Sequence, residues 1–121
     1  MINKKHLQIA LQISILMGIS STALAQDCED MPTKPAMTDG ATATMDQIVA
    51  NSEEVKAYIA AADTYLDCHA DYRQTIAYKS MSSEEKDASS DQAKALLDDR
   101  NDAGDEFNDE VQAYRDANPD A

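Results

Sequence analysis

Residues 44–69 read TMDQIVANSEEVKAYIAAADTYLDCH and decide the fold, because their larger or buried-type side chains recur in steps of three and four. That period marks one face of an α-helix. The series consists of Met45, Ile48, Val49, Ser52, Val55, Ile59, Ala62, Leu66 and His69, and it continues to Ile76. Thr44 and Gln47 form a capping-box pattern at its start. The sequence therefore predicts a helix over residues 45–79.

A second helical series fills the C-terminal part of the chain. It consists of Ala93, Leu96, Leu97, Arg100, Ala103, Phe107, Val111 and Tyr114. Ser82 and Glu85 form another capping-box pattern, and Asn118-Pro119 is a stop signal. These features predict a helix over residues 83–117 and a short tail over residues 118–121. Since no alternating strand pattern occurs, the expected fold class is all-α.

The link between the two predicted helices is short, at about residues 79–83. So short a link makes the helices antiparallel neighbours, in which the numbers of facing residues have a constant sum. A sum of about 162 pairs Leu66 with Leu96 and brings both apolar series to an end together. We therefore expect an antiparallel two-helix hairpin.

The first 25 residues have the pattern of a cleaved signal peptide. Lys4 and Lys5 precede an apolar run from residue 7 to residue 19, and Ala23 and Ala25 supply the small residues of a cleavage site. The run is too short to span a bilayer, which needs about 20 apolar residues. We expect cleavage after Ala25, a periplasmic or secreted product, and no membrane attachment afterwards.

The chain is strongly acidic, with 23 Asp and Glu against 10 Lys and Arg, a net charge of −13. Loss of Lys4 and Lys5 with the signal peptide leaves 8 basic residues against 23 acidic ones, a net charge of −15. Such a field repels nucleic acid and anionic lipid, and it attracts basic proteins, basic peptides and divalent cations.

Cys28 and Cys68 are the two cysteines of the chain. An exported chain with an even cysteine count usually oxidises them together. Residues 26–44 contain Pro32 and Pro35 and read as an extended arm, which reaches about 50 Å from Thr44 back to Cys28 at about 3.1 Å per residue. The helix from Thr44 to Cys68 covers only about 36 Å. The arm can therefore double back, and we expect a Cys28–Cys68 disulfide. A reactive or metal-binding thiol pair is the alternative, but no Cys-x-x-Cys motif supports it.

A face of the first helix is suited to receive this arm. Tyr65 and Tyr72 lie three residues before and four residues after Cys68, on the same side of the helix. Tyr58 extends the aromatic stripe, and Ala57 and Ala61 leave room for a backbone. These five residues are the expected arm-docking face.

Catalytic and metal-binding patterns are weak. The sequence contains no Glu-x-x-His motif, which a di-iron helix site needs, so His69 is not part of one. The Cys-x-x-Cys-His motif of haem attachment does not occur either. Residues 99–110 match several positions of a calcium loop, but Ala103 and Glu106 occupy positions that need an oxygen ligand and an apolar residue. We expect no enzyme activity, no cofactor and no metal.

Several motifs resemble a group of small, uncharacterised exported proteins of Gram-negative bacteria. They are Asp-Gly-Ala-Thr-Ala-Thr-Met at 39–45, Val-Lys-Ala-Tyr at 55–58 and Tyr-Leu-Asp-Cys at 65–68, with Asn101, Phe107-Asn108 and Tyr114-Arg115 in the second half. The resemblance implies an exported helical hairpin with an N-terminal arm, and it transfers no catalytic residue. Residues 100–104 are more polar than in the group.

Two functional hypotheses follow. The first is a non-catalytic protein-interaction or structural module of the cell envelope, whose partner is an envelope protein, favoured to be cationic, or a second copy. Pairing two hairpins into a four-helix bundle would bury Val49 and Tyr78. The second is an acidic protein that binds cations or inhibits a basic enzyme or peptide.

Overall fold

The computed structural model describes residue 28 and residues 30–121. The expected signal peptide and its cleavage site at Ala25 lie outside the described residues. Within them, 72% of the chain is helical and no strand occurs, so the all-α prediction is confirmed. The helices are α1 (Met45–Tyr72), α2 (Ile76–Lys79) and α3 (Ser83–Ala117).

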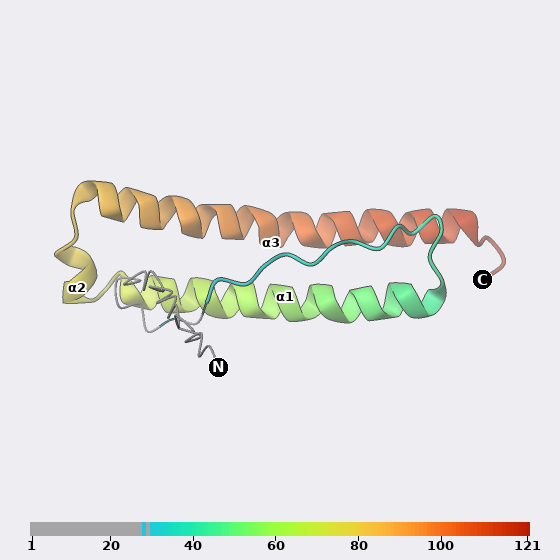
Figure 1. Ribbon diagram of the computed structural model, residues 1–121, viewed down its shortest axis with the longest axis horizontal. Coiled ribbons are helices and arrows are strands. Elements are labelled where there is room, and N and C mark those ends of the chain that lie inside the picture. Colours follow the sequence, from blue (N-terminus) through green and yellow to red (C-terminus); the bar gives the residue numbers. More distant parts are fainter. Residues whose placement is uncertain (1–27, 29) are drawn as a thin grey trace, which may run out of the picture.

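The two long helices lie side by side in opposite directions, as Figure 1 shows. The short helix α2 lies at one end of the pair, which we call the α2 end. The start of α1 and the end of α3 lie together at the other end, the open end. The described part of the arm, residue 28 and residues 30–44, runs between the long helices from the C-terminal part of α1 to the open end.

The first helix is shorter than the sequence predicted. Instead of continuing to residue 79, α1 ends at Tyr72, and a separate turn of helix follows. Thr75 causes the break, because its hydroxyl donates to the Tyr72 carbonyl at 2.7 Å and accepts from the Tyr78 amide at 3.2 Å. Side chains of this type compete with helical hydrogen bonds and favour helix caps. Ile76, predicted on the buried face, is consequently 83% exposed.

Both predicted helix starts are confirmed. Thr44 and Gln47 exchange side-chain and backbone hydrogen bonds at the start of α1, and Ser82 and Glu85 do the same at the start of α3. Each box satisfies two backbone amides that have no partner inside the helix. The second predicted helix, residues 83–117, has the same bounds as α3.

The core lies along the α1–α3 contact and near the middle of the molecule. It consists of Tyr58, Ala62 and Tyr65 from α1 with Leu96 and Ala103 from α3, flanked by Cys28, Met37, Ile59 and Leu66. Ala62 and Ala103 have no exposed surface, so small side chains allow the helices to pack closely. The arm contributes two of the flanking residues and is therefore part of the core.

Candidate functional site: the arm seat

The arm is joined to α1 by a disulfide between Cys28 and Cys68, whose Cα atoms lie 5.7 Å apart. The predicted pairing is confirmed, and no free cysteine remains among the described residues. The bond joins residues 40 positions apart. It fixes the far end of the arm near the C-terminal end of α1.

Asn51 of α1 fixes the middle of the arm. Its side-chain oxygen accepts from the Thr38 amide at 3.0 Å, and its side-chain nitrogen donates to the Ala36 carbonyl at 3.0 Å. The same nitrogen donates to Glu54 at 3.2 Å. Asn51 is only 2% exposed. A buried amide with these partners sets the register of the extended arm, because a shift by one residue would leave the amide unpaired.

The other side of the arm contacts α3. The Gly40 amide donates to the Glu110 carboxylate at 2.6 Å, and Lys34 pairs with Glu106 at 2.9 Å. Glu106 raises the pKa of Lys34 by accepting its hydrogen bond. Gly40 is buried, and a Cβ atom at this position would overlap the backbone carbonyl of Glu110. Only glycine allows the arm to approach α3 so closely.

We call the α1 and α3 side chains that hold the arm the arm seat. It consists of Asn51, Tyr58, Tyr65, Cys68, Glu106 and Glu110. Tyr58 and Tyr65 were predicted on the docking face and are buried, and Tyr72 is partly buried. Ala57 and Ala61 are exposed, which differs from the expected docking face. The contacts with α3 draw the arm toward the line between the two helices and away from these alanines.

Sequence reasoning missed the polar part of the arm seat. Asn51 falls between Ile48 and Val55 on the buried face of α1, and a polar residue at such a position is a signal for a buried hydrogen bond. Gly40 and Glu110 lie 70 residues apart, so no local pattern connects them.

The Tyr58 hydroxyl lies buried in the arm seat and has no hydrogen-bond partner among the described residues. Burial raises the pKa of Tyr58, and the carboxylate of Asp99 raises it further. Lys34 has the opposite effect. The phenol therefore stays neutral at physiological pH, and its ring serves as an apolar surface under the arm.

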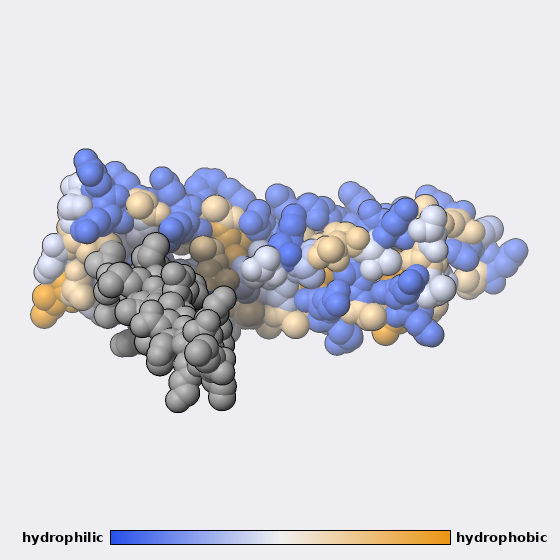
Figure 2. All heavy atoms as spheres, in the orientation of Figure 1, coloured by the Kyte–Doolittle hydropathy of each residue, from blue (hydrophilic) through white to orange (hydrophobic). Residues whose placement is uncertain are grey.

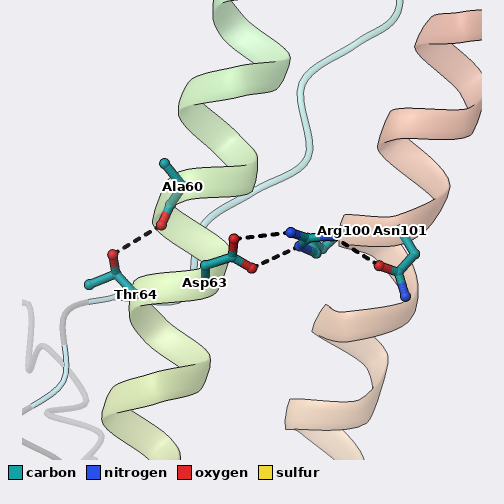
Figure 3. A network of polar contacts seen from close by, with 5 residues as sticks. All are labelled: Ala60, Asp63, Thr64, Arg100 and Asn101. Atoms are coloured by element: carbon teal, nitrogen blue, oxygen red, sulfur yellow. Dashed lines mark hydrogen bonds and ion pairs between the residues drawn. The ribbon is translucent and has the colours of Figure 1, made fainter.

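An ion pair connects the helices beside the arm seat (Figure 3). Arg100 of α3 donates to both carboxylate oxygens of Asp63 on α1, at 2.8 and 3.0 Å. This hydrogen bonding holds the pKa of Asp63 below its usual value. The pair is partly exposed and adds little stability by itself. The numbers of the two residues, 63 and 100, sum to 163, which is within one of the sum of about 162 expected for facing residues.

His69 and Ser89 form a polar contact near the α2 end. The His69 Nε2 atom lies 2.7 Å from the Ser89 hydroxyl, and His69 is 5% exposed. Burial lowers the pKa of His69, and the cation of Arg73 lowers it further. This is the closest approach to a nucleophile–base pair in the described chain, but no carboxylate there hydrogen-bonds the imidazole. The contact is a neutral interhelical hydrogen bond.

Acidic side chains line the outer side of α3. They are Glu84, Asp87, Asp91, Asp98, Asp102, Asp105, Asp109 and Asp116, and all are exposed. Their spacing in steps of three, four and seven puts them on one side of the helix. We call this set the acidic stripe. Figure 2 shows hydrophilic side chains along this outer edge. Of the eight, only Asp98 takes part in an ion pair between described residues, with Lys94.

Other classes of site were searched for in the same part of the chain. Among residues 28 and 30–121, no group of three or more His, Cys, Asp or Glu is arranged to hold a metal. None of the helices described has the length and apolar character that crossing a membrane requires. No protein-family model, curated protein or solved structure matches this chain.

Proposed function

We propose that the protein is an exported, non-catalytic interaction module of the cell envelope, built as an antiparallel helical hairpin with a stapled arm. The observation that carries the proposal is the acidic stripe. It extends over about 48 Å of α3 at 1.5 Å per residue, on the side away from the buried residues Leu96, Ala103 and Tyr114. A surface of this length and charge suits a cationic protein partner.

Export is supported by two independent features. Disulfides persist in oxidising compartments such as the bacterial periplasm, and the chain has a Cys28–Cys68 bond. Residues 1–25 have the composition of a signal peptide, with cleavage expected after Ala25. The resemblance to small exported proteins is consistent with the same location. The proposal therefore places the protein in the periplasm or outside the cell.

An inhibitory role is the second candidate, and the unpaired carboxylates favour it. Among the described residues, only Glu53, Asp63, Asp98 and Glu106 form ion pairs with basic side chains. Seven of the eight carboxylates of the acidic stripe form no such ion pair, so their charge is available for a basic enzyme or peptide. Inhibition requires that the bound protein block the active site of the basic enzyme, whereas a structural module only needs to bind.

The test compares two variants of the full chain that carry equal charge. In the stripe variant, Asp91, Asp102, Asp105 and Asp109 are changed to Asn. In the control variant, Asp30, Asp67, Asp71 and Asp120 are changed to Asn. All eight carboxylates are exposed and lie outside the ion pairs. Calorimetry with a basic lysozyme at moderate ionic strength is the first measurement, and a lysozyme activity assay separates inhibition from binding.

The proposal predicts that the stripe variant binds at least about tenfold more weakly than the native chain, and that the control variant changes by less than about twofold. Equal losses in both variants would mean that net charge alone attracts the partner, and the acidic stripe would not be a binding surface. If the native chain gives no heat of binding, the proposal that it binds basic proteins of the lysozyme type is wrong.

A further inference from the structure

The arm is held by contacts that do not depend on its connection to α1. Asn51 binds two backbone groups of the arm, Glu110 binds the Gly40 amide, and Glu106 pairs with Lys34. Residues 30–38 donate no backbone hydrogen bonds to one another; the first internal bond is from Thr42 to Asp39. The arm therefore binds as an extended peptide would, and an identical arm from another chain would make the same contacts.

We propose that the arm seat accepts the arm of a second copy before the disulfide closes. The product is a symmetric dimer in which each arm lies in the partner's seat and two Cys28–Cys68 bonds join the chains. In each bond, two thiols lose two protons and two electrons to a disulfide oxidant, whose own disulfide is reduced to two thiols. The partner is thus a second copy of this chain, and the site is independent of the acidic stripe.

The hinge of such an exchange is short. Gly40 is fixed against α3 by Glu110, and Thr44 is the cap of α1. The four steps from Gly40 to Thr44 span at most about 14 Å when extended. Gly40 contacts Glu110 in the last turns of α3 and Thr44 precedes α1, so both positions belong to the open end, where the start of α1 and the end of α3 lie together (Figure 1). Arm exchange therefore requires two copies to meet at their open ends.

Exposed apolar side chains are present where the copies would meet. Met45 and Val49 lie in the first turns of α1 and are 52% and 53% exposed. An isologous contact at the open end would cover the same two residues on both copies. Met45 and Val49 are exposed to water in the monomer. The contact between two copies would bury them against each other.

Two effects oppose exchange and set its conditions. The arm of the same chain competes at high effective concentration, so exchange needs open disulfides and concentrated protein. Asp46, Asp116 and Asp120 add like charges at the open end. Repulsion between exposed charges is screened by salt. The dimer fraction should therefore rise with both protein concentration and ionic strength during oxidation.

The test uses two complementary variants of the full chain. The Cys68→Ser chain keeps an arm thiol but has no thiol in its own seat, and the Cys28→Ser chain keeps only the seat thiol. The two chains are mixed in the reduced state and oxidised, and the disulfide-linked products are separated by mass. We expect the mixed dimer to form at least about tenfold faster than either symmetric dimer, because seating of the arm raises the local thiol concentration. If the mixed and symmetric dimers form in the proportions expected from random collision of the two chains, the proposal is wrong.

A second substitution tests whether seating causes the preference. Gly40→Val on the arm-donating chain places a side chain where the Glu110 backbone lies, and Ala41→Val is the control because Ala41 is exposed. The preference for the mixed dimer should disappear with Gly40→Val and persist with Ala41→Val. A preference that survives Gly40→Val contradicts the proposal.

The last test uses the native chain. After oxidation at high protein concentration and high salt, sedimentation should detect a dimer that dissociates only on reduction. A native chain that remains monomeric under these conditions contradicts arm exchange even if the variants pair.

Discussion

The two ends of the molecule are stabilised in different ways. From Cys68 toward the open end, the arm adds a third layer to the helix pair, with a disulfide, a buried amide and a close glycine contact. The described part of the arm begins at Cys28, beside Cys68, and does not extend over the α2 end, where the first buried residue of α3 is Leu96. The contact between α1 and α3 is long and contains few apolar residues. From Cys68 to the open end, the covalently attached arm stabilises it.

The α2 end is held mainly by polar and aromatic contacts. Tyr72 and Tyr78 pack edge to face with ring centroids 5.8 Å apart, and Arg73 and Lys86 lie within 6 Å of the Tyr78 ring centre. His69 and Ser89 add one interhelical hydrogen bond. Such contacts are individually modest. The comparison implies that loss of the arm would affect the molecule more than loss of any contact at the α2 end.

The largest effect is expected from opening the disulfide. Reduction, or Cys68→Ser in the absence of reductant, should lower the free energy of unfolding by about 4 kcal/mol, the chain-entropy value for a loop of this length. The near-UV signal of the tyrosines should change more than far-UV helicity, since Tyr58 and Tyr65 lie beside the arm. Unchanged thermal stability after complete reduction would show that the arm does not brace the helices.

The next effect comes from the core between the braced helices. Leu96→Ala should cost about 3 kcal/mol, because Leu96 is 3% exposed and its truncation leaves a cavity. Leu97→Ala is the matched control, since the neighbouring leucine is 45% exposed. Urea unfolding of both variants measures the difference. Equal losses would contradict the assignment of Leu96 to the core.

A smaller effect is expected from the buried amide. Asn51→Ala leaves the Thr38 amide and the Ala36 carbonyl without their partner and should cost about 2 kcal/mol. Asn108→Ala is the control, because Asn108 is exposed on α3. If Asn51 acts through the arm, the cost should shrink in the reduced protein, where the arm is no longer tethered. An Asn51→Ala cost that is the same in the oxidised and reduced proteins would place its role within α1 alone.

The smallest effect concerns pH at the α2 end. Burial and Arg73 lower the pKa of His69 in the folded protein below the ordinary value of 6.5, so the unfolded chain takes up the proton first. Neutral His69 makes its full contribution to the free energy of unfolding above pH 6.5. This contribution is lost as the pH falls from 6.5 to the lower pKa of the folded protein. His69→Gln should flatten the pH dependence of thermal stability between pH 7 and pH 5. A pH profile identical to that of the native chain would contradict this account.

Local signals in the sequence predicted the helix starts and the bounds of α3, because capping boxes and apolar periodicity act within a few residues. The disulfide followed from chain length and compartment. The break before Ile76 was missed because the apolar series was extended from His69 to Ile76, across Thr75, which caps α2. Asn51 and Gly40 were missed because their partners come from the arm and from α3. Contacts between distant segments leave no periodic trace in the sequence.

Hydrogen exchange followed by mass spectrometry, in the oxidised and the reduced protein, tests the central claim most directly. In the oxidised protein, residues 45–68 and 96–114 should exchange slowly and residues 73–90 should exchange fast, because only the first two segments are braced by the arm. Reduction should accelerate exchange in the braced segments and bring them toward the rate of the α2 end. Equal exchange at both ends of the oxidised protein, or protection unaffected by reduction, would contradict the claim that the arm stabilises the helix pair.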